Sequence, residues 1–396
     1  MKKYLSLILA LLLCFTLCPA VRAEDEPPAA AAVPAEHDYS YDLLEDGTAQ
    51  ITGYRGNDSN LSIPSGLGGI QVTRIGDYAF YGCTDLTSVT IPDSVIELGA
   101  KPFIGCEKLT AFTVSPEHPA LAVIEGVLFE KATKTLICYP MGKAQSSYAI
   151  PQGIQCIGEG AFYKCQNLNG ITIPDSVTTI GDSAFFWCTG LTDVIIPDSV
   201  TAIGNDGFGW CSNLTTVTIP DSVVSLGSNP FQDCKNLTTI QVSPEHPTLA
   251  LIDGVLFEKA TKTLICYPKG KAQSSYAIPQ GIRWIGAYAF LNCGLTSITI
   301  PDSVAAIGDC AFYRCSSLTS ITIPDSVMAI GDMAFSACTG LTSVTIPDSV
   351  MAIGLYAFSE CPKLTVTVGH NSYALQYCKR NEIPYIYPDS LDWLNN

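Results

Sequence analysis

The stretch LTSITIPDSVMAIGDMAFSAC, residues 318–338, is one copy of a pattern that recurs through most of this chain. Its central pentapeptide, Ile-Pro-Asp-Ser-Val, begins at seven isoleucines: Ile91, Ile173, Ile196, Ile219, Ile300, Ile323 and Ile346. In two series of three, successive copies are 23 residues apart. Because a unit this short cannot bury its own apolar side, we expect the copies to stack on one another as a solenoid.

The first half of each unit predicts a short strand. In the stretch 86–91, the side chains of Leu86, Val89 and Ile91 are expected to point into the core, whereas Thr90 points outward, as the alternation of a strand requires. Pro92 then ends the strand, because proline cannot donate a hydrogen bond to a neighbouring strand.

The second half predicts a turn. Asp77 follows a glycine and is placed to cap a short helical turn that holds Ala79 and Phe80. A period of about 20 to 29 residues headed by L-x-x-L-x-L is the signature of leucine-rich repeats. The predicted fold is therefore a leucine-rich-repeat solenoid: a right-handed curved rod, rich in β-structure, with short helical turns on its convex side and caps at both ends.

A larger duplication lies on top of the repeat. The segment that begins at Val114 recurs, offset by 128 residues, at Val242. Each copy is 36 residues long up to the next Ile-Pro and is read as one coil that carries a hairpin, with strands at 127–129 and 136–139 and again at 255–257 and 264–267. These hairpin-bearing coils span 114–150 and 242–278.

The remaining organisation follows from composition. Lys2 and Lys3, an apolar run over 5–17 and small residues before Glu24 predict a signal peptide at 1–23. Residues 24–38 are an acidic Ala/Pro spacer, 39–85 an N-terminal cap with the first repeat, 86–363 the leucine-rich repeats, and 364–396 a C-terminal cap with a helix near 372–381. We expect a secreted product without membrane insertion.

Charge limits the choice of partner. The formal net charge of −16 becomes −19 when the signal and its three basic residues are removed. A surface this acidic repels nucleic acid, whose binding needs clustered Lys and Arg, so nucleic acid is excluded as a partner.

Ten cysteines occupy one repeat position and form what we call the cysteine ladder: Cys83, Cys106, Cys165, Cys188, Cys211, Cys234, Cys293, Cys315, Cys338 and Cys361. Stacked coils would bring their Cα atoms within the range of a disulfide, but parallel side chains would not face each other. We expect buried, unpaired thiols, because a single row of ligands cannot surround a metal ion.

Two further rows are products of the repeat. The aspartate row, one residue after each Pro of the pentapeptide, could bind calcium or simply form turns, and the turn reading is favoured. The threonine row on the outer strand face could order water, but β-branched residues also suit strands, and Ile195 and Gln241 interrupt it. No metal or other cofactor is predicted.

The candidate ligand-binding residues are aromatic. The position before each ladder cysteine is predicted to face solvent, because it holds Gly82, Lys164, Asp233, Arg314 and Glu360 in other coils. In two adjacent coils it holds Trp187 and Trp210, with Phe186 beside the first. Two tryptophans one coil apart could bind a sugar or anchor a protein partner; alternatively they cover each other or pack on a hairpin.

At these motifs the chain resembles the BspA-type leucine-rich repeat of bacterial surface and secreted proteins. The resemblance rests on Ile-Pro-Asp-Ser-Val, on Ile-Gly-Asp-x-Ala-Phe and on the closing cysteine, as at Ile323, Ile330 and Cys338, and covers roughly residues 39–387. It implies a curved solenoid at the cell exterior, associated with adhesion and protein binding, without catalytic residues. No wall-anchoring module of the kind that some members carry is visible.

The predicted function is a non-enzymatic adhesion or protein-binding scaffold, active as a monomer on host or cell-surface proteins. The alternative is a carbohydrate- or mucin-binding module that uses Trp187 and Trp210. A hydrolase is a distant third reading, because the sequence contains no G-x-S-x-G, H-E-x-x-H or phosphate loop.

Overall fold

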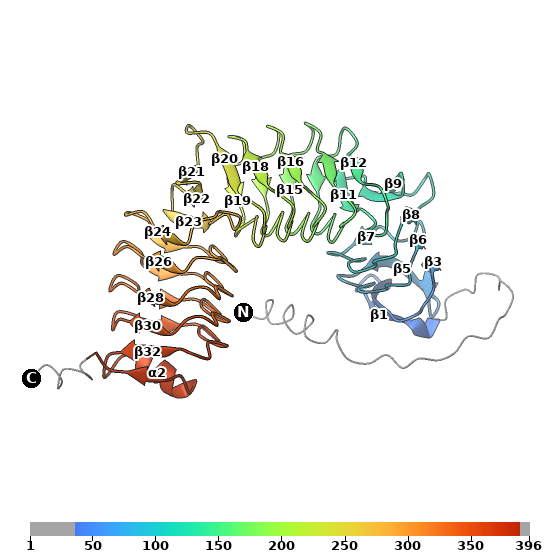
Figure 1. Cartoon of the computed structure of the whole chain (residues 1–396). Coiled ribbons are helices and arrows are strands. Elements are labelled where there is room, and N and C mark those ends of the chain that lie inside the picture. The colour runs from blue at the N-terminus through green and yellow to red at the C-terminus, as the bar shows by residue number, and fades with distance from the viewer. Residues whose placement is uncertain (1–35, 389–396) are drawn as a thin grey trace, which may run out of the picture. The chain divides into compact units, whose positions relative to one another are not determined.

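The computed structural model describes residues 36–388, so the predicted signal peptide, most of the spacer and the last eight residues lie outside the described residues. The described chain is a solenoid of stacked coils, which confirms the predicted leucine-rich-repeat class (Figure 1). Each regular coil contributes one strand to each of two parallel stacks, and the apolar side chains lie between the stacks.

The first strand stack contains mostly strands that end at or just before an Ile-Pro. They pair in parallel, with the coil-to-coil register set by the repeat, as in Thr322 opposite Thr345. The members are β3 (Asn60–Ser62), β6 (Ser88–Thr90), β8 (Ala111–Thr113), β12 (Ser147–Ala149), β14 (Gly170–Thr172), β16 (Asp193–Ile195), β18 (Thr216–Ile219), β20 (Thr239–Val242), β24 (Ser275–Ala277), β26 (Ser297–Thr299), β28 (Ser320–Thr322), β30 (Ser343–Ile346), β32 (Thr365–Val368) and β33 (Tyr385–Ile386).

The second strand stack consists mostly of two-residue strands that follow the pentapeptide. Within it, the inward residue of one strand lies opposite the inward residue of the next, as in Ile307 and Ile330. The members are β5 (Ile70–Ile75), β7 (Glu97–Leu98), β13 (Cys156–Ile157), β15 (Thr179–Ile180), β17 (Ala202–Ile203), β19 (Ser225–Leu226), β25 (Trp284–Ile285), β27 (Ala306–Ile307), β29 (Ala329–Ile330) and β31 (Ala352–Ile353).

Antiparallel meanders interrupt the stacks at the duplicated coils. The first is built from β9 (Leu121–Ile124), β10 (Val127–Glu130) and β11 (Thr135–Cys138), and the second from β21 (Leu249–Ile252), β22 (Val255–Glu258) and β23 (Thr263–Cys266) (Figure 1). They separate three runs of regular coils, which we call the first segment (39–113), the second segment (147–242) and the third segment (275–387).

The apolar core divides at the same two places. One cluster of buried side chains serves each segment, and the central strand of each meander contributes to two clusters. In β10, Leu128 belongs to the core of the first segment and Phe129 to that of the second. In β22, Leu256 belongs to the second and Phe257 to the third. These strands are therefore buried on both faces.

The expected short helical turns are absent from the repeats: in residues 36–388 helix is assigned only to η2 (Glu36–Asp38) and α2 (Tyr373–Arg380). Each coil instead makes consecutive β-turns with positive φ at two positions, such as Ser183 and Trp187. Alternate backbone N–H groups donate to the next coil, as Phe185 N–H does to the Gly207 carbonyl at 2.8 Å. In a helix these N–H groups would donate to carbonyls of the same coil. Here they donate to the neighbouring coil, so hydrogen bonds between stacked coils form in place of a helical turn.

Asp77 also differs from the prediction, since its carboxylate accepts the Ala100 N–H of the following coil at 2.7 Å rather than capping its own turn. Asp182, Asp309 and Asp332 make the same contact to the next coil. At the chain ends, β1 (Tyr39–Leu43) pairs antiparallel with β2 (Ala49–Tyr54), β4 (Gly66–Leu67) pairs with β5, and Ser372 caps α2.

Candidate functional site

The predicted aromatic residues lie in the turns that connect the second strand stack to the first. Phe186 and Trp187 follow β15, and Trp210 follows β17. The backbone fixes the two tryptophans one coil apart, because Trp187 N–H donates to the Gly209 carbonyl and Trp210 N–H to the Gln232 carbonyl, both at 2.8 Å. Both residues adopt the left-handed backbone conformation, with φ of 64° and 60°.

The structure brings the three predicted residues together with two others, Tyr163 and Lys164, in what we call the aromatic column. The rings of Trp187 and Trp210 stack with centroids 5.1 Å apart and an interplanar angle of 22°. Phe186 stacks on Tyr163 at 5.7 Å and meets Trp187 edge-on at 6.4 Å. The ring spacing matches the separation of about 4.8 Å between stacked strands, so the repeat itself sets it.

Glycine at position 209 makes room for this arrangement. A Cβ on Gly209 would lie 3.0 Å from the Phe186 ring and 3.2 Å from Cγ of Gln232. The same repeat position carries aromatic residues at Tyr163 and Phe186, so a side chain in place of Gly209 would require the ring of Phe186 or the side chain of Gln232 to shift slightly.

The ammonium group of Lys164 lies at one end of the aromatic column. The Lys164 ammonium lies 5.5 Å from the centre of the Trp187 ring and 5.9 Å from that of Tyr163, within cation–π range. Trp187 is thus covered by Lys164 and by Trp210, and all three predicted aromatic residues are half-buried. Lys164 is half-buried as well and lies 3.7 Å from a carboxylate oxygen of Glu107.

One expectation at this repeat position is wrong. Asp233, one coil beyond Trp210, was expected to face solvent but is only 3% exposed. Lys269 of the second hairpin coil forms an ion pair with it, and Asn292 of the third segment donates to its Oδ1 at 3.1 Å. The hairpin coil lacks the turn that regular coils have, so the coils on either side of it come into direct contact and bury the carboxylate.

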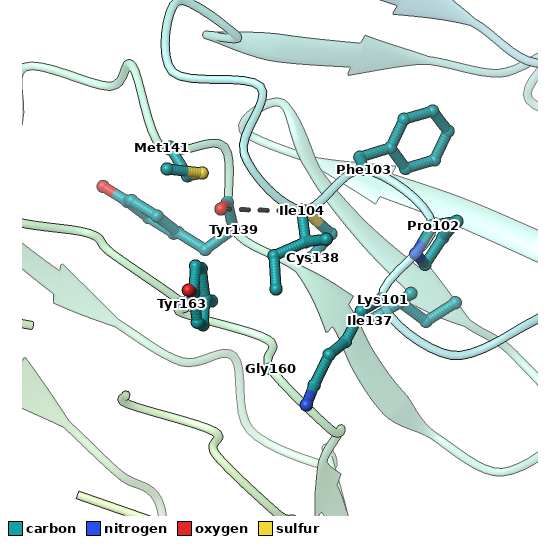
Figure 2. A pocket seen from close by; sticks show the side chains of 10 residues that line it. All are labelled: Lys101, Pro102, Phe103, Ile104, Ile137, Cys138, Tyr139, Met141, Gly160 and Tyr163. Carbon is teal, nitrogen blue, oxygen red and sulfur yellow. Dashed lines mark hydrogen bonds between the residues drawn. The ribbon is translucent and has the colours of Figure 1, made fainter. Parts of the chain in front are cut away.

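At the corresponding place between the first and second segments, a small pocket takes the place of this ion pair. Figure 2 shows the residues that line it, with Met141 and Tyr139 on one side, Lys101 and Phe103 on the other, and Ile104 between them. Its free space is about that of a single water molecule, so it holds no ligand of useful size. Met141 occupies the position that Lys269 has in the duplicate.

The cysteine ladder serves the scaffold. Eight of its ten members are buried, as predicted, and Cys83 and Cys361 are partly exposed. Seven thiols donate to the carbonyl of the phenylalanine in the preceding coil, as Cys188 does to Phe162 at 2.8 Å. Burial raises the pKa of the buried Cys211 thiol well above its usual value, which makes it an inert packing group.

The two buried histidines, His118 and His246, also serve the scaffold. Nδ1 of His118 accepts the backbone N–H of Leu121 at 3.0 Å, and its Nε2 lies 3.2 Å from the Pro92 carbonyl. His246 repeats both contacts in the duplicate. Burial lowers the pKa of both rings. Within residues 36–388 there is no group of three His, Cys, Asp or Glu residues placed to hold a metal ion.

Comparisons with known proteins agree with this architecture. The chain matches the model for the BspA type leucine rich repeat region in six copies, over residues 57–137, 138–262 and 266–381, and it therefore belongs to that family. No curated protein sequence matches it. None of the helices in residues 36–388 has the length and apolar character that crossing a membrane requires.

Solved structures similar to it include two that align over most of this chain. A leucine rich cell surface protein from Faecalibacterium prausnitzii is 29% identical, with a TM-score of 0.50, over 91% of this chain and 99% of that one. The pneumococcal vaccine antigen PcpA is 21% identical, with a TM-score of 0.51, over 88% and 96% of the two chains, and supports the fold alone. The chain is a leucine-rich-repeat scaffold of a type found in bacterial surface proteins.

Proposed function

We propose that the protein is a secreted or surface-associated, non-enzymatic scaffold that binds proteins of a host or of another cell and thereby mediates adhesion. Membership of the BspA-type family and similarity to a cell surface protein support this role. The observation that carries the proposal is the aromatic column, where residues of neighbouring coils form a half-buried, partly apolar surface beside a lysine.

The geometry favours a protein over a glycan at this surface. A sugar binds an aromatic residue through the open face of its ring, but both faces of Trp187 are covered, by Lys164 and by Trp210. Tryptophan is enriched among the anchor residues of protein interfaces. A glycan is the second candidate because Trp210 stacks on one side only among residues 36–388.

The test is the double variant Trp187→Ala/Trp210→Ala of the chain from residue 24, with the exposed Ile195→Ala as the matched control. Binding is measured by surface plasmon resonance to purified extracellular-matrix proteins and to mucin glycans. A distributed protein interface predicts that matrix binding weakens about tenfold while the control is unchanged. Complete loss of mucin-glycan binding, with no effect on protein binding, would instead establish the alternative.

The non-enzymatic and secreted parts of the proposal have their own tests. Mass spectrometry of the exported protein should give a chain that begins at Glu24, since cleavage is expected after Ala23. Purified chain incubated with mucin, peptides and glycosaminoglycans should leave all of them intact; reproducible turnover of any of them would contradict the non-enzymatic reading.

A further inference from the structure

The third segment carries an exposed apolar stripe on the outer face of its second strand stack. Trp284, Met328 and Met351 are 42%, 49% and 67% exposed, and it is their grouping in adjacent coils that makes them a surface patch. The parallel register of β25, β27, β29 and β31 places Trp284, Ala306, Ala329 and Ala352 side by side, with the two methionines in the adjacent row. We call these six residues the third-segment stripe.

The second segment shows that the repeat does not require this stripe. The two hairpin coils are identical from 126 to 154 and from 254 to 282 except at Met141 and Lys269, but the first differences beyond them replace Gln155-Cys156 by Arg283-Trp284. At the stripe positions that follow, the second segment has Thr179 and Thr201 where the third has Ala306 and Met328, and it keeps Ala202 and the exposed Val224 where the third has Ala329 and Met351. The same scaffold therefore folds with hydroxyl groups on this face.

Rows of carboxylates flank the stripe on both sides. On one side, Asp325 and Asp348 lie three residues before the two methionines, and on the other side Asp309 and Asp332 follow the alanines; all four are exposed. The Oδ1 atoms of Asp309 and Asp332 accept backbone N–H groups of the next coil, which fixes these carboxylates in place. Beyond the coil of Trp284, where the exposed Arg283 occupies the methionine row, the strip lies between two anionic borders and is complementary to an apolar strip between two cationic ones.

We propose that the third-segment stripe is a docking surface for a cationic amphipathic α-helix, which lies across the coils with its apolar face on the stripe and its Lys and Arg residues on the two carboxylate rows. The coils are spaced by about 4.8 Å and the turns of a helix by about 5.4 Å, so successive apolar side chains of the helix meet successive coils. The surface is separate from the aromatic column and does not depend on it.

The probe is a synthetic Leu/Lys peptide of about 14 residues, long enough to cross the four coils at 1.5 Å per residue, with leucines on one helical face. The chain from residue 24 should bind it, and the peptide should gain helical circular dichroism on binding. A peptide of the same composition in scrambled order, and an amphipathic Leu/Glu peptide, should bind at least tenfold more weakly. Equal binding of all three peptides would overturn the proposal.

Variants locate the site. Met328→Thr/Met351→Thr substitutes exposed residues, so it should retain the wild-type thermal unfolding and lose at least tenfold in affinity. Asp325→Asn/Asp348→Asn should weaken binding and reduce its dependence on salt. The reciprocal variant Thr179→Ala/Thr201→Met, which builds a stripe on the second segment, should increase the number of peptides bound per chain. Unchanged affinity in the methionine variant would overturn the proposal.

Two other results separate this surface from its competitors. Trp187→Ala/Trp210→Ala should bind the peptide as the wild type does, whatever its effect on the proposed adhesion, so the two proposals can fail independently. Analytical ultracentrifugation should show the same monomer for the wild type and for Met328→Thr/Met351→Thr. A wild-type dimer that the methionine substitutions dissociate would show that a second copy occupies the stripe, and would overturn the proposal.

Discussion

At the scale of single residues, the position in the repeat accounts for the burial and the contacts of most side chains. The exceptions are sites at which a side chain lowers the stability of the fold. Asp206 is one exception. It lies at a turn position with φ of 54°, and its Oδ1 is buried without a hydrogen-bond partner in the described chain. Burial and the neighbouring Asp182 carboxylate raise the pKa of Asp206 from 3.8 to about 7, although Lys101 opposes the shift. A neutral side chain would suit this position better than an ionised one.

We therefore expect Asp206→Asn to stabilise the protein above neutral pH. A carboxyl group whose pKa is higher in the folded state contributes stability at low pH and loses it as the pH rises from about 4 through about 7. Asparagine stays neutral and already occupies the same position in the next coil, at Asn229. Urea unfolding at pH 8 should show a gain on the order of 2 kcal/mol, and the gain should vanish near pH 4.

The exposed Asp198→Asn is the control, and a surface substitution of this kind should change the free energy of unfolding by less than about 0.5 kcal/mol at both pH values. If Asp206→Asn behaves like this control at pH 8, the Asp206 carboxylate is hydrated in solution and its burial is not the cause of any strain.

At the scale of elements, the strands of the first stack and their inward residues could be predicted, because a 23-residue period fixes them in every regular coil, whereas the short strands of the second stack were missed. The turns could not be predicted correctly. Ala79 and Phe80 suggested a helix, but the N–H groups of alternate turn residues bond to the next coil, which a single unit does not reveal. The exposure of Asp233 was mispredicted for a similar reason, since its cover comes from Lys269 and Asn292, which are 36 and 59 residues away.

The duplicated hairpin coils offer a direct test of this buried ion pair. Where the second has Asp233 and Lys269, the first has Gly105 and Met141. We expect Lys269→Met to destabilise the protein by about 3–5 kcal/mol, because it leaves a buried carboxylate without its cation. The double variant Asp233→Gly/Lys269→Met should recover most of that loss, because it copies the arrangement of the other hairpin coil and glycine suits the positive φ of position 233.

Chemical denaturation of the two single variants and the double variant measures the coupling. Met141→Lys, which introduces a lysine opposite Gly105 with no carboxylate to meet it, serves as the matched control and should not be rescued by Asp233→Gly. Losses from the two single variants that simply add in the double variant would show that Asp233 and Lys269 do not stabilise each other.

At the scale of the whole molecule, the apolar core divides into three clusters at β10 and β22, because the two faces of each of these strands are buried in different clusters. The family and the solenoid could be recognised from the repeated motifs alone, whereas the surfaces proposed to bind partners could not, because the repeat consensus leaves outward positions free. Trp187 and Trp210 could be singled out because most other coils have glycine or a charged residue at that repeat position. The exposed stripe was missed, because Met328 and Ala329 look like core residues until the register of β29 is known.

A solenoid whose coils contact mainly their neighbours should unfold in parts, and the central strand of each meander should decide which part is affected. In β22, the side chain of Leu256 lies in the core of the second segment and that of its neighbour Phe257 in the core of the third. Leu256→Ala should therefore increase native-state hydrogen exchange in residues 147–242, and Phe257→Ala in residues 275–387. Each loss should be on the order of 2–5 kcal/mol.

Mass spectrometry of the exchanged protein in mild denaturant reads both segments in one experiment. The first meander supplies the control, because Leu128→Ala should loosen residues 39–113 and leave the third segment as it is in the wild type. If Leu256→Ala and Phe257→Ala instead raise exchange equally along the whole chain, the three clusters unfold as one cooperative unit, and the meanders transmit stability rather than divide it. An increase of hydrogen exchange in different segments after substitution of two adjacent residues distinguishes a segmented solenoid from a single continuous core.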